Sequence, residues 1–280
     1  MTTTVGIVGA GTMGGGIAEA AARAGCEVLL HDISAPALTQ AMRKIADAFR
    51  PRTGGRGVED PEALARIRPR RDMRDMAAAE IVIEAAFEDI AVKGEIFRAL
   101  DAACRPGTVL ATNTSSLSVT AIGGLTRAPE FVVGMHFFNP APRMKLVEIV
   151  RGSRTSDATI EKARSLALAM GKTPILCADT PGFIVNRVAR PFYGEALRLL
   201  GEGAASAEEI DRIVRLAGGF RMGPFELMDL IGIDVNYAVT KSVYEQFFHE
   251  PRFRPHPIQR RMVEAGTLGR KTGRGFYRHG

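Results

Sequence analysis

His136 and Glu148 are the residues of this chain best placed for proton transfer. His136 lies near the end of an apolar run at residues 131–137, and Glu148 lies inside the next run, at residues 146–150. If the two runs pair as a hairpin centred on Pro142, residues 136 and 148 face each other and the carboxylate can hold the imidazole. A histidine held in this way is a typical general base or acid. Taken alone, the two residues also fit a buried core histidine and an edge-strand glutamate that faces water.

Two polar groups lie near other apolar segments. Residues 113–116, with the sequence Asn-Thr-Ser-Ser, follow the run at residues 108–112, so the Ser115 hydroxyl can contact a ligand at the carboxyl edge of a sheet. Asn186 lies among apolar neighbours near the start of the later, helical part of the chain. Turn formation by the first group and a helix cap at the second are the structural alternatives.

A glycine-rich turn joins the first apolar run to a helical segment. Such a turn lets the backbone approach a pyrophosphate at the amino end of a helix, where the helix dipole favours negative charge. The pattern alone is weak, but a second strand-like run at residues 27–31 and then Asp32 follow it, and this combination is specific. The turn consists of Gly9, Ala10, Gly11, Thr12, Met13 and Gly14.

Asp32 indicates which dinucleotide the turn binds. It is placed to accept hydrogen bonds from ribose hydroxyls, and its charge would repel the 2′-phosphate of NADP, for which Ile33 and Ser34 supply no cation. We therefore predict NAD as the cofactor, ahead of NADP and of FAD, whose second contact segment is not visible. No metal site is predicted. A histidine base together with NAD indicates oxidation or reduction at a hydroxyl-bearing carbon of a small molecule.

The order of apolar and amphipathic segments predicts the fold that positions these residues. Short apolar runs alternate with helical segments through the first 180 residues, which is the rhythm of a parallel sheet. Start and stop signals, such as Gly25, Ser34 and Ser156, flank the helical segments. We predict an α/β fold, with a Rossmann-type, doubly wound and mostly parallel sheet over residues 1–180. The apolar runs are residues 5–8, 27–31, 81–86, 108–112, 131–137, 146–150 and 173–178.

A second, smaller, all-helical domain is predicted for residues 181–280. Every later segment has helical spacing, and no strand-like run bounded by turns remains. Ser206 and Glu209 have the spacing of a capping box, and Asp234 is a candidate helix cap. Gly218 and Gly266 are candidate stops. We expect this domain to contribute to the substrate cleft and to form a homodimer, because it has many apolar positions for its length.

Composition limits the classes of protein that fit. The chain has 280 residues, 46% of them hydrophobic, and a net charge of +6. Its arginine clusters lack a nucleic-acid motif, so a solvated basic face or an acidic small ligand is favoured over nucleic acid. No run reaches 18 apolar residues and a strand begins within the first five, so we expect no membrane span, no targeting segment and a cytoplasmic location. The cysteines, expected to be reduced and buried, are Cys26, Cys104 and Cys177.

Several motifs together resemble the 3-hydroxyacyl-CoA dehydrogenases, over nearly the whole chain. The resemblance implies reversible, NAD-dependent oxidation of an L-3-hydroxyacyl-CoA to the 3-oxoacyl-CoA. A chain of this size is most similar to the bacterial 3-hydroxybutyryl-CoA dehydrogenases, which implies a short acyl chain and a place in fatty acid metabolism. The motifs are the glycine turn, residues 113–116, His-Phe-Phe-Asn-Pro at 136–140, and residues 182–187, 222–227 and 269–277.

The resemblance also implies roles for individual residues. His136 is the catalytic base or acid and Glu148 orients it, while Ser115 and Asn186 contact the reacting oxygen or hold substrate and nicotinamide. The resemblance also implies cofactor contacts by Glu88, Lys93, Ser115, Asn139 and Lys271. Of these, Glu88 and Lys93 also fit ordinary surface charge at the start of a helix.

Two other functions fit parts of the sequence. A dehydrogenase of a free hydroxy acid or sugar acid, such as gulonate, shares the two-domain plan and the histidine–glutamate pair, and inhibition by free CoA would argue against it. A catalytically silent NAD-binding structural protein, as some lens crystallins related to the family are, would bind NADH without turning over a hydroxy compound. The sequence leaves open the acyl-chain length, the physiological direction and the pathway.

Three positions depart from the pattern of the family, and all concern the substrate. Residues 50–57 replace a longer, lysine-bearing helical hairpin that usually helps to cover CoA, although arginine also grips phosphate. Arg221 precedes Met222 where proline is common. Arg143 lies between His136 and Glu148, where a small apolar residue is common.

We predict that Arg143 favours a short or polar acyl group. A long apolar chain would have to pass a charged guanidinium, whereas a short or polar one would not. The measurement is kcat/KM for four-carbon and ten-carbon acyl-CoA substrates in the natural chain and in Arg143→Ala. Equal efficiency toward both chain lengths, unchanged by the substitution, would contradict the prediction.

Overall fold

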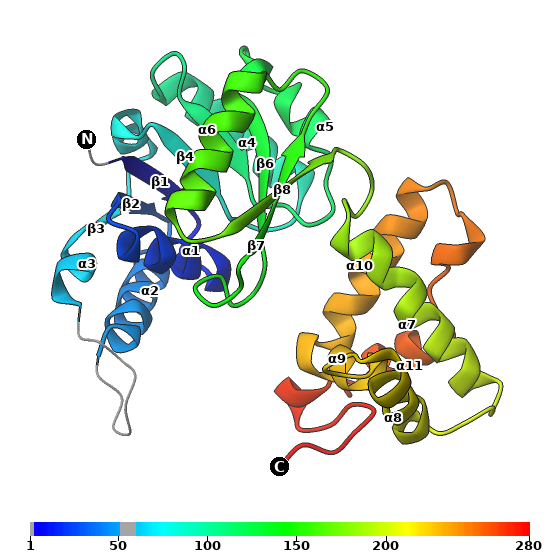
Figure 1. Cartoon of the computed structure of the whole chain (residues 1–280). Coiled ribbons are helices and arrows are strands. Elements are labelled where there is room, and N and C mark those ends of the chain that lie inside the picture. Colours follow the sequence, from blue (N-terminus) through cyan, green and yellow to red (C-terminus); the bar gives the residue numbers. More distant parts are fainter. Residues whose placement is uncertain (1–2, 51–59) are drawn as a thin grey trace. The chain divides into compact units, whose positions relative to one another are not determined.

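The computed structural model describes residues 3–50 and 60–280 (Figure 1). The chain divides into two compact units, Met1–Thr180 and Pro181–Gly280, which are called the sheet unit and the helical unit. Of the basic segment at residues 50–57, only Arg50 belongs to the described residues, so the expectation of a CoA contact there lies outside them.

An eight-stranded sheet forms the centre of the sheet unit (Figure 1). Its strand order is β3-β2-β1-β4-β5-β6-β7-β8, and β6 and β7 are its antiparallel neighbours in an otherwise parallel sheet. The central strands are buried, which explains their continuous apolar runs. The predicted fold class, a doubly wound α/β sheet followed by helices, is confirmed. The strands are β1 (Thr4–Val8), β2 (Glu27–His31), β3 (Ile67–Arg70), β4 (Ile81–Glu84), β5 (Val109–Thr112), β6 (Val132–Phe137), β7 (Leu146–Arg151) and β8 (Thr173–Ala178).

Helices cover both faces of this sheet. Helices α1, α2 and α6 share one hydrophobic core with the strands, and α4 and α5 pack on the other face. As predicted, side chains cap the starts: Ser34 accepts a hydrogen bond from the Ala37 N–H, and Ser156 accepts one from the Thr159 N–H. The α-helices are α1 (Thr12–Arg23), α2 (Ala35–Ala48), α3 (Pro61–Ala65), α4 (Ile90–Ala103), α5 (Val119–Gly123) and α6 (Asp157–Ala169), with 3₁₀ turns η1 (Met73–Ala78) and η2 (Pro129–Phe131).

The strand β3 was not expected from the sequence. It lies at the edge of the sheet, where only Ile67 is buried and Arg68 and Pro69 face solvent. An edge strand tolerates a proline because one side of its backbone needs no partner. Arg68 also pairs with Glu27 of β2 at 3.0 Å. Arg68, one of the clustered arginines that fit a solvated basic face, therefore lies on this edge strand and faces solvent.

The three cysteines are free, and their burial differs from the expectation. Cys26 is buried as predicted, whereas Cys104 and Cys177 are only half-buried. Burial raises the pKa of the Cys104 thiol to about 11 and that of Cys177 to about 12, so both stay protonated near pH 7.

The helical unit is built from α-helices and short turns around its own core. Tyr193, Leu197, Phe225, Met228 and Ile233 are among the buried side chains of that core. The elements are α7 (Val185–Gly201), α8 (Ala207–Gly218), α9 (Pro224–Ile231), α10 (Ile233–Gln246), η3 (Pro251–Phe253), α11 (Pro257–Glu264) and η4 (Arg270–Thr272).

The helix boundaries of this unit test the predicted caps. Ser206 and Glu209 form the predicted capping box at the start of α8. The prediction that Asp234 caps a helix was wrong: Gly232 is the cap of α10, and Asp234 lies in its first turn. There its carboxylate pairs with Lys271, which explains why an acidic residue is placed at a helix start without capping it.

Two buried carboxylates hold the carboxyl-terminal segment against α8 and α9. Asp229 accepts hydrogen bonds from the backbone N–H groups of Phe276 and Tyr277, each at 2.9 Å, and lies 2.8 Å from the His279 ring. Asp211 accepts the Tyr277 hydroxyl at 2.8 Å. Because Asp211 and Asp229 are each 1% exposed, these contacts are shielded from water.

We predict that Asp229→Ala destabilises the chain by about 2–4 kcal/mol, since it leaves buried donors of the terminal segment without an acceptor. Urea denaturation measures the change. The matched control is Glu264→Ala in the same unit, which removes an exposed ion pair with Arg260 and should destabilise the chain far less. Equal stability of the two variants would show that the buried contacts do not hold the segment.

Candidate active site

The glycine turn between β1 and α1 has a backbone that only glycine fits at two positions. Gly9 has a φ of +104°, and a Cβ there would lie 2.7 Å from the Ala85 carbonyl oxygen. A Cβ at Gly14 would lie 1.8 Å from the Gly9 carbonyl oxygen. These contacts bring the start of α1 tightly against β1 and β4.

The amino end of α1 remains open to a ligand. A Cβ on Gly11 would meet no atom within 4 Å, and no side chain caps the helix. The first N–H groups of α1 therefore point to a space without side chains, as a bound pyrophosphate requires. Ala10 and Thr12 flank this position, and Met13 is half-buried behind it.

Asp32 closes the turn from the end of β2. Its carboxylate accepts hydrogen bonds from the N–H of Ala10 and the N–H of Ser34, both at 2.8 Å. The next residue, Ile33, is 83% exposed and carries no charge. Asp32 is thus held beside the glycine turn as a fixed acceptor, and these residues fit the adenosine ribose and pyrophosphate of NAD.

His136 and Glu148 meet across the antiparallel pair of strands. They are direct partners in the register of β6 and β7, so the pairing predicted from the sequence is confirmed. The His136 Nδ1 lies 2.7 Å from the Glu148 Oε2, and the residues are 6% and 1% exposed. The Phe138 ring packs against the imidazole, with centroids 4.4 Å apart. A carboxylate at this nitrogen fixes the orientation of the imidazole ring.

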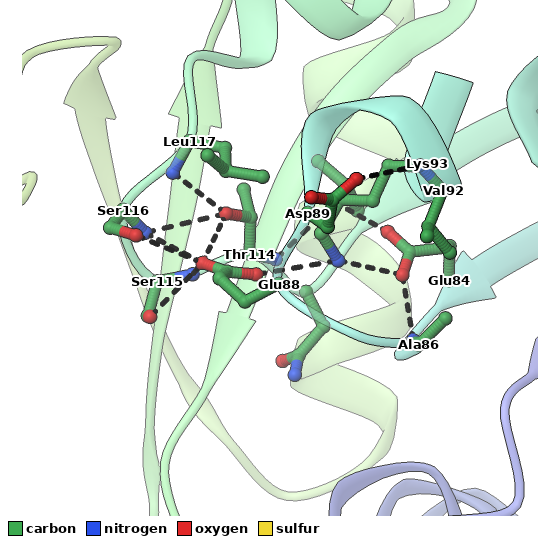
Figure 2. Close-up of polar contacts among 12 residues, drawn as sticks. Glu84, Ala86, Glu88, Asp89, Val92, Lys93, Thr114, Ser115, Ser116 and Leu117 are labelled. Carbon is green, nitrogen blue, oxygen red and sulfur yellow. Dashed lines mark hydrogen bonds and ion pairs between the residues drawn. The ribbon is translucent and has the colours of Figure 1, made fainter. Parts of the chain in front are cut away.

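Glu88 holds the loop that carries Ser115 (Figure 2). Its Oε1 accepts hydrogen bonds from the Thr114 hydroxyl at 2.6 Å, the Ser115 N–H at 2.7 Å and the Ser116 N–H at 3.0 Å. Burial favours a higher pKa for Glu88, but the charge of Lys93 and the hydrogen bonds from this loop outweigh it, so the pKa lies below its usual value. Glu88 is therefore an anion at neutral pH.

Lys93 lies behind Glu88 in a buried ionic network (Figure 2). Its Nζ is 2.7 Å from Glu84 Oε1 and 3.4 Å from Glu88 Oε2. Lys93 is 1% exposed and Glu84 is fully buried. Glu84 also accepts hydrogen bonds from the Thr112 hydroxyl and the Ala86 N–H, each at 2.7 Å. The network links β4, β5 and the start of α4. Glu88, which lies just before α4, connects it to the Ser115 loop.

The motifs in the sequence did not point to Glu84 as a residue of the site. It ends the apolar run of β4 and is the sole charged residue of that strand, Ile81–Glu84. A carboxylate in a buried strand requires a partner, and Lys93 follows nine residues later on the next helix. That pairing is the signal that could have identified Glu84.

The remaining predicted contacts lie on both units. Asn139 is exposed just after β6 in the sheet unit. Asn186 is the second residue of α7 in the helical unit, where its backbone oxygen accepts a hydrogen bond from Arg190. Lys271 lies in η4 with its Nζ 2.7 Å from Asp234 Oδ2. Each unit therefore contributes part of the predicted set.

A groove of about 1020 Å³ opens in the sheet unit beside α1 and α2. It begins at the glycine turn and extends past the loop between β6 and β7. Its wall carries both signs of charge: Arg23 pairs with Glu19, and Arg50 pairs with Asp47. Lys44 and Arg143 also line it, and neither forms an ion pair with another described residue. The groove can thus receive an anionic ligand next to the dinucleotide site.

The fold, the glycine turn and Asp32 define a Rossmann-type NAD-binding domain. The chain belongs to the 3-hydroxyacyl-CoA dehydrogenase family: the family's NAD-binding domain matches residues 4–180 and its C-terminal domain matches residues 182–279.

Individual relatives support this membership. A 3-hydroxyadipyl-CoA dehydrogenase of Escherichia coli is 51% identical over 98% of the chain, which spans only 58% of that protein. A probable 3-hydroxybutyryl-CoA dehydrogenase of Deinococcus radiodurans is 40% identical, with 98% and 99% of the two chains covered. The crystal structure of a (S)-3-hydroxybutyryl-CoA dehydrogenase from Ralstonia eutropha matches with a TM-score of 0.94 at 42% identity over both whole chains.

Among the described residues, no helix is long and apolar enough to cross a bilayer.

We predict that Glu84→Gln destabilises the chain by about 3–5 kcal/mol, because it leaves the buried Lys93 without its closest counter-charge. The double variant Glu84→Gln with Lys93→Met should recover part of that loss, since neither charge then remains buried. Glu95→Gln on the exposed side of α4 is the control and should change stability by less than about 0.5 kcal/mol. Strictly additive losses in urea denaturation would argue against a coupled pair.

Proposed function

We propose that this chain is an NAD-dependent dehydrogenase that interconverts L-3-hydroxyacyl-CoA and 3-oxoacyl-CoA, with a short acyl chain such as 3-hydroxybutyryl. The observation that carries the proposal is the buried contact of 2.7 Å between His136 and Glu148 in a domain with an NAD-binding turn. Family membership supports the reaction class, and the names of several relatives support the thioester substrate.

Proton transfer in the proposed reaction belongs to His136. Bound NAD supplies the hydride acceptor. As C3 of the substrate gives up its hydride, Nε2 of His136 takes the proton of the hydroxyl group, so the substrate loses two electrons and two hydrogens and becomes the 3-oxo thioester. In reverse, the imidazolium returns that proton to the oxygen of the 3-oxo group.

Glu148 and the Ser115 loop complete the proposed catalytic machinery. The Glu148 carboxylate holds the imidazole and stabilises the imidazolium that forms during oxidation. Ser115 and Asn186 contact the substrate oxygen as its charge develops, and the Ser115 hydroxyl turns toward it from Glu88 Oε1, to which it donates at 3.1 Å. Glu88 contacts the cofactor and fixes Ser115, while the burial of Lys93 supports an indirect role through Glu88.

The groove beside α1 and α2 is the proposed site for the CoA moiety. It begins at the glycine turn, and its Arg23, Lys44 and Arg50 side chains match the phosphates of CoA. Asn139 also lines this groove, and with Lys271 it stays a proposed cofactor contact. A free hydroxy acid would leave most of the groove unused, which favours the thioester over the gulonate-like alternative.

We also propose that the chain works in the cytoplasm as a homodimer that associates through the helical unit. Apolar side chains are exposed on and after α8, where Ile213 is 62%, Leu216 77% and Phe220 53% exposed. Burying such side chains against a second copy would remove apolar surface from water.

The acyl group has two candidates. Several relatives are named for 3-hydroxybutyryl-CoA, whereas the Escherichia coli relative is named for 3-hydroxyadipyl-CoA, whose acyl chain ends in a carboxylate. Both substrates undergo the same chemistry at C3. The difference therefore lies in the residues that meet the far end of the chain.

We predict that the chain oxidises NADH when given acetoacetyl-CoA, and that His136→Ala lowers kcat about 10²- to 10⁴-fold with NADH affinity nearly unchanged, because only the proton transfer is lost. The assay is the fall in NADH absorbance, with NADPH and free acetoacetate as control reactants. His31→Ala, which removes another buried histidine at the end of β2, is the matched variant for general structural damage. Turnover of free acetoacetate without the thioester, or full activity of His136→Ala, would refute the proposal.

A further inference from the structure

Arg190 carries a buried positive charge, and no carboxylate in the described part of the chain forms an ion pair with it. The residue lies on α7 and is 4% exposed. Its guanidinium donates to three neutral oxygens: the Asn186 carbonyl at 3.0 Å, the Asn236 carbonyl at 2.9 Å and the Thr240 hydroxyl at 2.8 Å. Burial lowers the pKa of Arg190 to about 10, so the group stays charged near pH 7.

The hydrogen bonds of Arg190 leave donors unused. Its Nε and Nη1 make all three contacts, and its Nη2 makes none with the described residues. Asn236, which accepts from Arg190, is itself 1% exposed and has a buried side-chain nitrogen, Nδ2, without a partner. The guanidinium also lies over the Tyr193 ring, 5.0 Å from its centroid, but the neutral ring does not cancel the charge. Unmatched donors and a buried charge without a counter-ion are costly in a folded protein. A ligand carboxylate would supply both the missing acceptors and the missing charge.

The position of this charge on α7 relates it to the proposed substrate. Arg190 follows Asn186 by four residues, one helical turn, and its side chain folds back so that Nε donates to the Asn186 carbonyl. The guanidinium therefore lies close to the level of Asn186, the residue proposed to contact the oxygen on C3. In a six-carbon acyl chain the terminal carbon lies three bonds beyond C3, roughly 4 Å away. Four residues of an α-helix rise about 6 Å along its axis, so the positions of Asn186 and Arg190 on α7 are separated by a length of the same order.

We propose that Arg190 binds a carboxylate at the far end of the acyl chain, so that the preferred substrates are CoA thioesters of 3-hydroxy dicarboxylic acids of about six carbons. This inference rests on the proposed function for the thioester and the reaction at C3, and of the two acyl candidates given there it selects the one that ends in a carboxylate over 3-hydroxybutyryl. It adds the residue that selects the acyl group, and it leaves the roles of His136 and Glu148 unchanged.

The first test compares two ligands of equal length on the natural chain. NADH oxidation is followed with 3-oxoadipyl-CoA and with 3-oxohexanoyl-CoA, which lacks the terminal carboxylate. We expect kcat/KM to be roughly 10- to 100-fold higher for the carboxylated substrate, the range of a charge-assisted hydrogen bond. Calorimetric binding of adipyl-CoA and hexanoyl-CoA gives the same comparison without turnover. Equal affinities overturn the inference, even where both 3-oxo thioesters are reduced and the proposed function stands.

The second test separates recognition from a structural role of Arg190. Arg190→Met should remove the preference for the carboxylate by lowering kcat/KM for 3-oxoadipyl-CoA alone, with that for 3-oxohexanoyl-CoA within about threefold of the natural chain. Arg190→Lys keeps the charge and should keep part of the preference. Arg198→Met, on the exposed side of α7, is the matched control. An equal loss for both substrates in Arg190→Met, with Arg190→Lys behaving alike, would mean that Arg190 only links α7 to α10.

Discussion

The antiparallel pairing of β6 and β7 is the constraint on which the candidate active site depends. In an otherwise parallel sheet, this reversal places Glu148 directly opposite His136 on the same face. A shift of one residue would turn Glu148 to the other face of the sheet, because side chains alternate along a strand. Strand β8 then continues parallel to β7, which fixes β7 from its other side. The 2.7 Å contact between His136 and Glu148 therefore depends on the register of the sheet as well as on the two side chains.

Buried charged residues are the second feature that positions the candidate site. Glu84 and Lys93 hold β4, β5 and α4 together. Glu88 contacts Lys93 and accepts the Ser115 N–H, so it connects this network to the Ser115 loop. Such a network makes the position of Ser115 depend on the buried residues Glu84 and Lys93. The same logic applies in the helical unit, where Asp229 fixes the segment that also carries Lys271. In both units, buried acids determine where exposed polar groups lie.

Much of this arrangement could be predicted from the sequence, because it follows from local patterns. Apolar runs gave the central strands, and the hairpin geometry gave the partner of His136. Features set by tertiary contacts were missed. β3 contains a proline and arginines, so it lacks an apolar run, and its place at the edge is visible only in the folded sheet. Asp234 resembles a cap, but its partner Lys271 lies 37 residues away. Arg190 looks like an ordinary helix residue until its burial is known.

The two edges of the sheet differ in how they resist pairing with another strand. β3 presents Pro69, which lacks an N–H donor, together with exposed arginines, and both features disfavour the addition of a foreign strand. β8 also contains a proline, Pro174, but its neighbours Ile175 and Leu176 are 42% and 52% exposed. An apolar edge of this kind is the more vulnerable template for intermolecular β-aggregation. During folding or heating, misassembly of this protein should therefore begin at β8, and charged substitutions there would protect it.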